Sequence, residues 1–161
     1  MKYDLEEILD NIETILKAKL NAKIAEIEAE KTVLGKPIGL NPVDNLAYIQ
    51  QTWSDKILQY TPAIFFGVEE IQSTGANTAT LEIFKIFVEV VFVDSGNDLY
   101  GIKRLHRYSR ALKEVFQENY DALPWSTKVN IETVRPISFK LEEDSSEDIR
   151  VGGVSIVAGL A

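Results

Sequence analysis

Residues 81–93, LEIFKIFVEVVFV, alternate in a way that predicts one long β-strand with apolar side chains on both faces. The even-numbered face is apolar throughout and carries Phe84, Ile86, Val88, Val90 and Phe92. The odd-numbered face, interrupted only by Lys85 and Glu89, carries Leu81, Ile83, Phe87, Val91 and Val93. An antiparallel strand usually leaves one face in water and shows this by polar positions on that face. Both faces of this strand therefore need cover, and a partner surface is the simplest source of it.

Residues 3–31 predict one long amphipathic helix, because apolar side chains recur at three- and four-residue spacing. These side chains belong to Leu5, Ile8, Leu9, Ile12, Ile15, Leu16, Leu20, Ile24 and Ile27. Gly35 and Pro37 then end the pattern. We expect the apolar stripe to pack on the rest of the chain, and the alternative is a coiled coil with a second copy.

Residues 32–61 are predicted to be irregular, because glycine and proline punctuate the segment. One short helix is expected around residues 43–51. A connection this long within a small domain is often functional, or becomes ordered only against a partner. The segment therefore favours a protein that works in an assembly.

Four strands and a second helix are predicted in the rest of the chain. Strands over residues 63–72 and 81–93 flank a cluster of turn-forming residues and form an antiparallel hairpin. A helix over 99–120 follows, and strands over 128–138 and 151–160 complete the pattern. The order helix, strand, strand, helix, strand, strand predicts an α+β fold, with both helices packed on one face of a four-stranded antiparallel sheet.

Length and composition add limits to this fold. At 161 residues the chain can bury a core, and we predict a single domain made of the helix (1–31), the irregular segment (32–61) and the sheet with its helix (62–161). No apolar run approaches the roughly 20 residues that span a bilayer, and the acidic N-terminus lacks the pattern of a secretion signal. The lack of cysteine excludes disulfides, thiolate zinc sites and cysteine nucleophiles, and it fits a reducing compartment.

Charge is unevenly distributed in this chain, whose net charge is -8. Such a balance argues against a nucleic-acid binder, which needs basic surface to neutralise phosphates. Lys103, Arg107 and Arg110 nevertheless share one face of the second predicted helix, with His106 and Lys113 beside them. This basic stripe is either a solvated helix face or a contact for an acidic neighbouring subunit.

Two acidic clusters in the sequence are candidate cation sites. The first comprises Asp94, Asn97 and Asp98, and the second, LEEDSSED, spans residues 141–148. Neither has the ligand spacing of an EF-hand. We expect a turn with a helix N-cap at the first cluster and a solvated hairpin loop at the second, which could pair with basic groups of a neighbour.

Catalytic chemistry has little support in the sequence. The chain has one histidine, His106, on an exposed-looking part of a helix, and a hydrolase triad needs a base beside a nucleophile. Metalloprotease, Walker and dinucleotide motifs are missing from the sequence. We therefore expect neither an enzyme nor a cofactor.

Several segments of the chain together resemble one family. They are the N-terminal amphipathic helix, PAIFFGVEE, LEIFKIFVEVVFVD, the helix DLYGIKRLHRYSRALKEVF and the closing strand VGGVSIVAGL. Their layout is similar to that of the tail terminator, or tail-completion, proteins of tailed bacteriophages. The resemblance covers about residues 60–161, and residues 32–61 match no pattern of that family.

This resemblance implies a structural virion protein assembled in the host cytoplasm. It implies a ring, typically of six copies, that closes the head-proximal end of a tail, stops polymerisation of the tail tube protein and presents a surface to the head–tail connector or stopper protein. The candidate contacts between subunits are Ile83, Phe87 and Val91, together with Lys103, Arg107 and Arg110. The alternating pattern leaves open whether the apolar contact is instead made by Phe84, Ile86 and Val88.

Three other functions remain open from the sequence. One is a different neck or head–tail connector subunit of the same virion. Another is a small cytoplasmic ligand-binding α+β domain, in which the strand over residues 81–93 would line an apolar pocket. An enzyme ranks last, because no nucleophile, base and metal ligands converge in the sequence.

Overall fold

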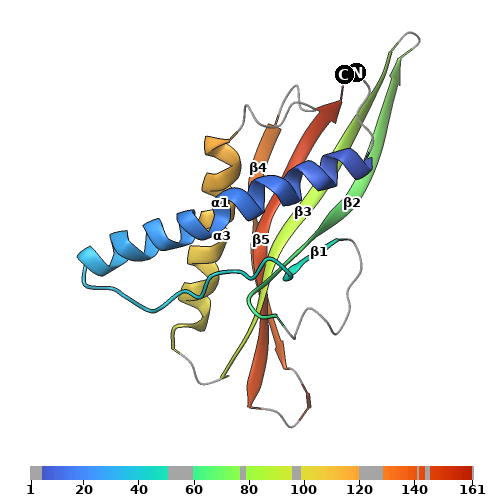
Figure 1. Ribbon diagram of the computed structural model, residues 1–161. Helices are drawn as coiled ribbons and strands as arrows, with labels where there is room; N and C mark the ends of the chain where they lie inside the picture. The colour runs from blue at the N-terminus through green and yellow to red at the C-terminus, as the bar shows by residue number, and fades with distance from the viewer. Residues whose placement is uncertain are drawn as a thin grey trace.

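The computed structural model describes residues 5–50, 60–76, 79–95, 99–119, 129–140, 142–143 and 146–160. This part of the chain forms two helices and five strands: α1 (Leu5–Val33), β1 (Tyr48–Gln50), β2 (Ala63–Ala76), β3 (Ala79–Ser95), α3 (Gly101–Glu118), β4 (Val129–Lys140) and β5 (Glu147–Leu160). Figure 1 shows α1 running across the strands, with α3 beneath its middle, alongside β4 and β5. Neither of these helices has an apolar stretch long enough to cross a membrane.

The strands form one mixed sheet in the order β1-β2-β3-β5-β4. Strand β1 is parallel to β2, and every other neighbouring pair is antiparallel. The predicted α+β class and the predicted hairpin of β2 and β3 are confirmed. The prediction of a four-stranded, purely antiparallel sheet is wrong, because β1 adds a parallel strand at one edge.

Strand β1 also replaces the short helix expected around residues 43–51, so that prediction is wrong as well. Tyr48 and Ile49 are residues that favour strands, and they pair with Ile64 and Phe65 of β2. The backbone N–H of Ile64 donates to Ala47 O at 2.8 Å, which extends this pairing. Without β1, the backbone groups along this edge of β2 would lose their partners.

Most predicted strands are shorter than those in the structure. The β2–β3 hairpin continues to Ala76 and Ala79, and β5 begins at Glu147, opposite Ser95. A register shift between Val68 and Glu70 marks a bulge in β2. Some predicted positions lie outside the described part: residue 51 of the short helix, residue 120 of the second helix, residue 128 of the third strand, and the side chain of Leu81. Residues 97–98, 141 and 144–145 of the two acidic clusters lie outside it as well.

The core lies between the helices and the even-numbered face of β3. Exposure is 0% for Ile86, Val88 and Val90 and at most 6% for Phe84 and Phe92. The same core contains the apolar stripe of α1, formed by Ile8, Leu9, Ile12, Ile15, Leu16, Leu20, Ile24 and Ile27. This stripe is therefore used inside the chain, which contradicts the coiled-coil alternative.

Residues 36–43, which we call the strap, connect the end of α1 to the segment before β1. The side chain of Asn21 binds Val43 in both directions, donating from Nδ2 to the carbonyl at 2.9 Å and accepting the N–H at Oδ1 at 2.8 Å. Val43 is buried, as is Ala47 just before β1. This part of the predicted irregular segment is thus ordered by the chain itself, and ordering by a partner stays a prediction for the remainder.

Candidate functional site

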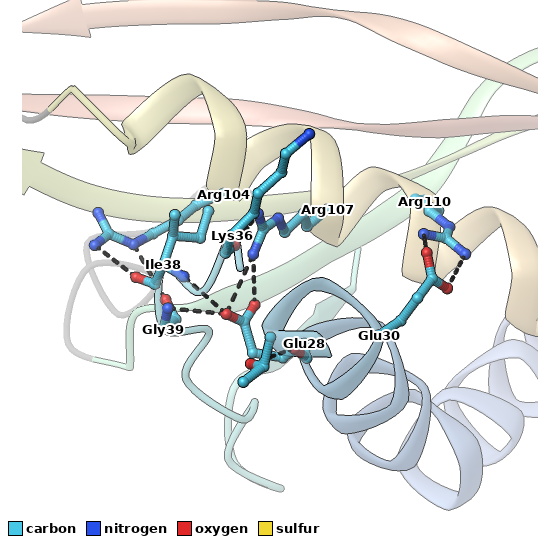
Figure 2. Close-up of polar contacts among 9 residues, drawn as sticks. Glu28, Glu30, Lys36, Ile38, Gly39, Arg104, Arg107 and Arg110 are labelled. Atoms are coloured by element: carbon cyan, nitrogen blue, oxygen red, sulfur yellow. Dashed lines mark hydrogen bonds and ion pairs between the residues drawn. The ribbon is translucent and has the colours of Figure 1, made fainter. Parts of the chain in front are cut away.

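The half-buried carboxylate of Glu28 on α1 organises the contact between the strap and α3. Arg107 of α3 donates from Nη1 to both oxygens of Glu28, at 2.9 and 3.2 Å, and from Nη2 to Lys36 O at 2.6 Å. The backbone N–H groups of Ile38 and Gly39 also donate to Glu28 Oε1, at 2.9 and 3.0 Å (Figure 2). Burial alone would raise the pKa of Glu28, but these hydrogen bonds together lower it.

Two further side chains of α3 hold the strap. Arg104 donates to the carbonyl oxygens of Ile38 and Gly39, at 3.1 and 3.2 Å (Figure 2). The Tyr108 hydroxyl donates to Asn41 O at 2.8 Å, and burial raises the pKa of this phenol to about 12. Gly39 has φ +72°, a left-handed conformation that glycine adopts without a Cβ clash. The strap is therefore bound through its backbone, which makes this contact depend little on its side chains.

Arg110 makes a more exposed contact with the same end of α1. Its Nη1 and Nη2 donate to the two oxygens of Glu30, at 3.0 and 2.8 Å, and its Nε donates to Glu114 at 2.7 Å. These carboxylates raise the pKa of Arg110, and the hydrogen bonds that it donates to Glu30 have the largest effect.

The structure thus shows that the residues of the predicted basic stripe differ in exposure. Arg107 is 8% exposed, so a solvated helix face is wrong for this residue. Lys103 is exposed and lies over the Tyr100 ring at 5.6 Å. That Lys103, Arg107 and Arg110 meet an acidic neighbouring subunit stays a prediction, although the two arginines already bind acids of their own chain.

The remaining charge of this region surrounds an open hollow of about 260 Å³, which we call the basic pocket. Its walls come from the end of α1, the strap and α3, and consist of Lys31, Lys36, Lys103, His106, Arg107 and Arg110. His106 is exposed here, so the structure places it among cations. The spacing of residues along the sequence predicted that the basic residues of α3 lie together. Lys31 and Lys36 are brought into the same pocket only by the fold.

Asp94 has a different partner from those the sequence suggested. Its Oδ2 accepts from Arg150 Nε at 2.6 Å, and both side chains are under 10% exposed. Ser138 Oγ accepts a second bond from Arg150, at 2.8 Å, while Asp94 Oδ1 has no hydrogen-bond partner among the residues that the structure describes. The N-cap of α3 is Tyr100, without a side-chain capping bond, so the prediction of a helix N-cap within the first acidic cluster is wrong. The described residues contain no group of acids and histidines able to hold a metal ion.

The odd-numbered face of β3 points away from the core, and no described helix covers it. We call this surface the open face. Phe87 lies beside Phe65 of β2, with ring centroids 5.0 Å apart, and Val157 of β5 shares this face through its pairing with Lys85. Burial, and then the nearby charge of Glu69, raise the pKa of Glu89 on this face. A largely apolar surface, interrupted by the half-buried Glu89 and by Lys85, which pairs with Glu69 at 3.5 Å, therefore lies opposite the helices.

The structure separates the two predicted sets of apolar contact residues. Phe84, Ile86 and Val88 lie in the core, so they cannot form a surface contact. Ile83 and Phe87 are half-buried on the open face, where a neighbour can reach them. Val91 shares this face but is 0% exposed, so a neighbouring subunit cannot reach its side chain in this conformation.

Comparison with known proteins adds no relative: no family model matches the sequence, and no curated protein matches it. The function is therefore inferred from the open face, the basic pocket and the resemblance seen in the sequence.

Proposed function

We propose that this chain is a structural virion protein that forms a ring at the head-proximal end of a phage tail. The ring stops polymerisation of the tail tube and provides the surface that joins the head. Its partners are other copies of the chain, the tail tube protein and the head–tail connector or stopper protein. The role requires no chemical step and no cofactor.

The open face is the observation that carries this proposal. Phe65 and Phe87 form an aromatic pair there, and Ile83 lies on the same face of β3. Aromatic side chains of this kind are enriched in protein interfaces and supply much of their binding energy. A second copy packed on this surface would give β3 the cover on its second face that its sequence pattern demands.

Packing through a face is favoured over pairing through a sheet edge. Strand β4 forms the outer edge of the sheet beside β5, and its register shifts between Val134 and Ile137. The residues skipped there include Pro136, which has no N–H to donate to an added strand. An incoming strand would therefore lose continuous pairing in the middle of this edge.

Electron microscopy of particles made after disruption of the gene tests the role directly. Overlong tails without heads are the result expected for a tail terminator. Tails of normal length that fail to join heads would assign the chain to another connector subunit of the neck. Unaffected particles would refute a role in the virion.

A further inference from the structure

The basic pocket concentrates positive charge in a chain whose net charge is -8. Glu28 pairs with Arg107, and Glu30 and Glu114 pair with Arg110. Lys31, Lys36 and Lys103 form no ion pair with any residue in the described ranges. Like charges that line one hollow of about 260 Å³ repel one another. An anionic group placed in the pocket would remove that repulsion, so the pocket indicates an acidic occupant.

The same chain contains an acidic segment, whose charge is opposite to that of the pocket. Residues 141–148 contain five acids and no base. Asp148 already lies 4.0 Å from both Lys140 and Arg150, whereas the exposed Glu142 and Glu143 make no such contact with a described residue. These two glutamates can therefore serve a partner at little cost to the fold of their own chain.

The acidic segment and the basic pocket lie in different parts of the molecule. Strand β4 ends and β5 begins at the lower end of the sheet in Figure 1, whereas the end of α1, which lines the pocket, projects to the left. Among the described residues, no hydrogen bond or ion pair joins Glu142 or Glu143 to the pocket within one chain. Two unlike surfaces that are complementary but separated generate a head-to-tail contact, which closes into a ring when the rotation allows.

We propose that the basic pocket of one copy binds the β4–β5 loop of a second copy, through Glu142 and Glu143. This inference rests on the proposed ring and assigns the polar part of its repeating contact, beside the apolar contact made by the open face. Because the contact is electrostatic and exposed, it contributes direction and register to the ring, and it weakens as the salt concentration rises.

A charge exchange tests this contact with the full chain. One variant carries Lys31→Glu and Lys36→Glu, and the other carries Glu142→Lys and Glu143→Lys. Each variant should raise the concentration needed for self-association, measured by sedimentation velocity at low salt, by about tenfold or more, because like charges would then face each other. All four positions lie at or near the surface, so circular dichroism should show both variants folded.

Restoration of assembly is the decisive readout. An equimolar mixture of the two variants again pairs opposite charges at every contact, as does a chain that carries all four substitutions, so both should assemble near the wild-type concentration. Lys19→Glu and Glu6→Lys, on exposed positions of α1 outside the pocket, serve as controls that make the same type of charge reversal at one site each and should leave assembly unchanged.

The outcomes also separate this inference from the proposed function. If both the pocket variant and the loop variant form rings as well as the wild type, the pocket contact is overturned and the ring itself is left intact. Loss of assembly in both variants without rescue in the exchanged chain would overturn the pairing of these two surfaces. A wild-type chain that stays monomeric at all concentrations and low salt would overturn the ring itself, and the pocket contact with it.

Discussion

Replacing Glu28 by glutamine should destabilise the fold far more than the same change at Glu30, two residues away. Both acids lie on α1 and both bind an arginine of α3, but their exposures differ. The side chains of Glu28 and Arg107 are 19% and 9% exposed, whereas those of Glu30 and Arg110 are 47% and 37% exposed. The pair therefore offers a matched test of what burial contributes.

The magnitude follows from the contacts of each pair. Breaking a buried ion pair by removing one charge costs about 3–5 kcal/mol, because the other charge stays buried. Glutamine keeps an oxygen that can accept the N–H groups of Ile38 and Gly39, and Glu28 is partly exposed, so we expect about 2–3 kcal/mol for Glu28→Gln. Arg110 keeps Glu114 and is open to solvent, so Glu30→Gln should cost much less than Glu28→Gln.

Urea unfolding measures this difference. With a dependence of about 2 kcal/mol per molar urea, Glu28→Gln should lower the unfolding midpoint by about 1 M, whereas Glu30→Gln should lower it far less. The effect should also depend on pH. Because the folded chain lowers the pKa of Glu28 from 4.5, its contribution is present above pH 4.5 and is lost as the pH falls through the lower folded value.

Equal and small losses for the two variants would refute the role of Glu28 as the buried centre of the strap contact. So would a difference between wild type and Glu28→Gln that persisted unchanged well below pH 4. A double-mutant cycle with Arg107→Met isolates the pair itself, and a coupling energy near zero would mean that Arg107 does not depend on Glu28.

Three further perturbations address the other surfaces. Phe87→Asp should leave a folded chain that no longer self-associates in sedimentation, whereas Val88→Asp, which turns the charge into the core, should unfold it; unfolding by both would place Phe87 in the core. Gly101→Ala should lower the melting temperature by several degrees, because the new Cβ would overlap both Asp94 Oδ2 and Arg150 Nε; an unchanged melting temperature would show that this buried pair is easily displaced. Glu89→Gln should stabilise the chain at pH 7 and lose that advantage below pH 4.5, because the folded state raises the pKa of Glu89 and so prefers its neutral form; a stability gain at pH 7 that remained equal at pH 4 would contradict this origin.

Hydrophobic periodicity was sufficient to predict the large elements. Helix α1 and strand β3 each repeat their pattern over many residues, so local sequence determines both. Strand β1 could not be found this way, because three residues carry no period and the strand exists through its pairing with Ile64, Phe65 and Phe66. The conformation of such a short segment is determined by the strand with which it pairs more than by its own propensity.

The functional surfaces divide in the same way. Spacing brought Lys103, Arg107 and Arg110 together, since they share one helix, but their partners on α1 lie about 80 residues away in the sequence. Nothing in the spacing could tell that Arg107 is buried on Glu28 while Lys103 stays exposed. The choice between the two faces of β3 was also undetermined, because both faces are apolar and only the placement of the helices makes one of them the core.

The way the strap is held has a consequence for the order in which the chain folds. Its contacts with Arg104, Arg107 and Tyr108 join positions 65 to 71 residues apart, so they cannot form until α3 is in place. The hairpin of β2 and β3 needs only neighbouring residues and can form early. We therefore expect the strap to dock on α3 late in refolding, after the amides of β3 have gained protection in pulse-labelled hydrogen exchange. The strap would then be among the last parts of the chain to reach its final position, held by a helix more than sixty residues later in the sequence.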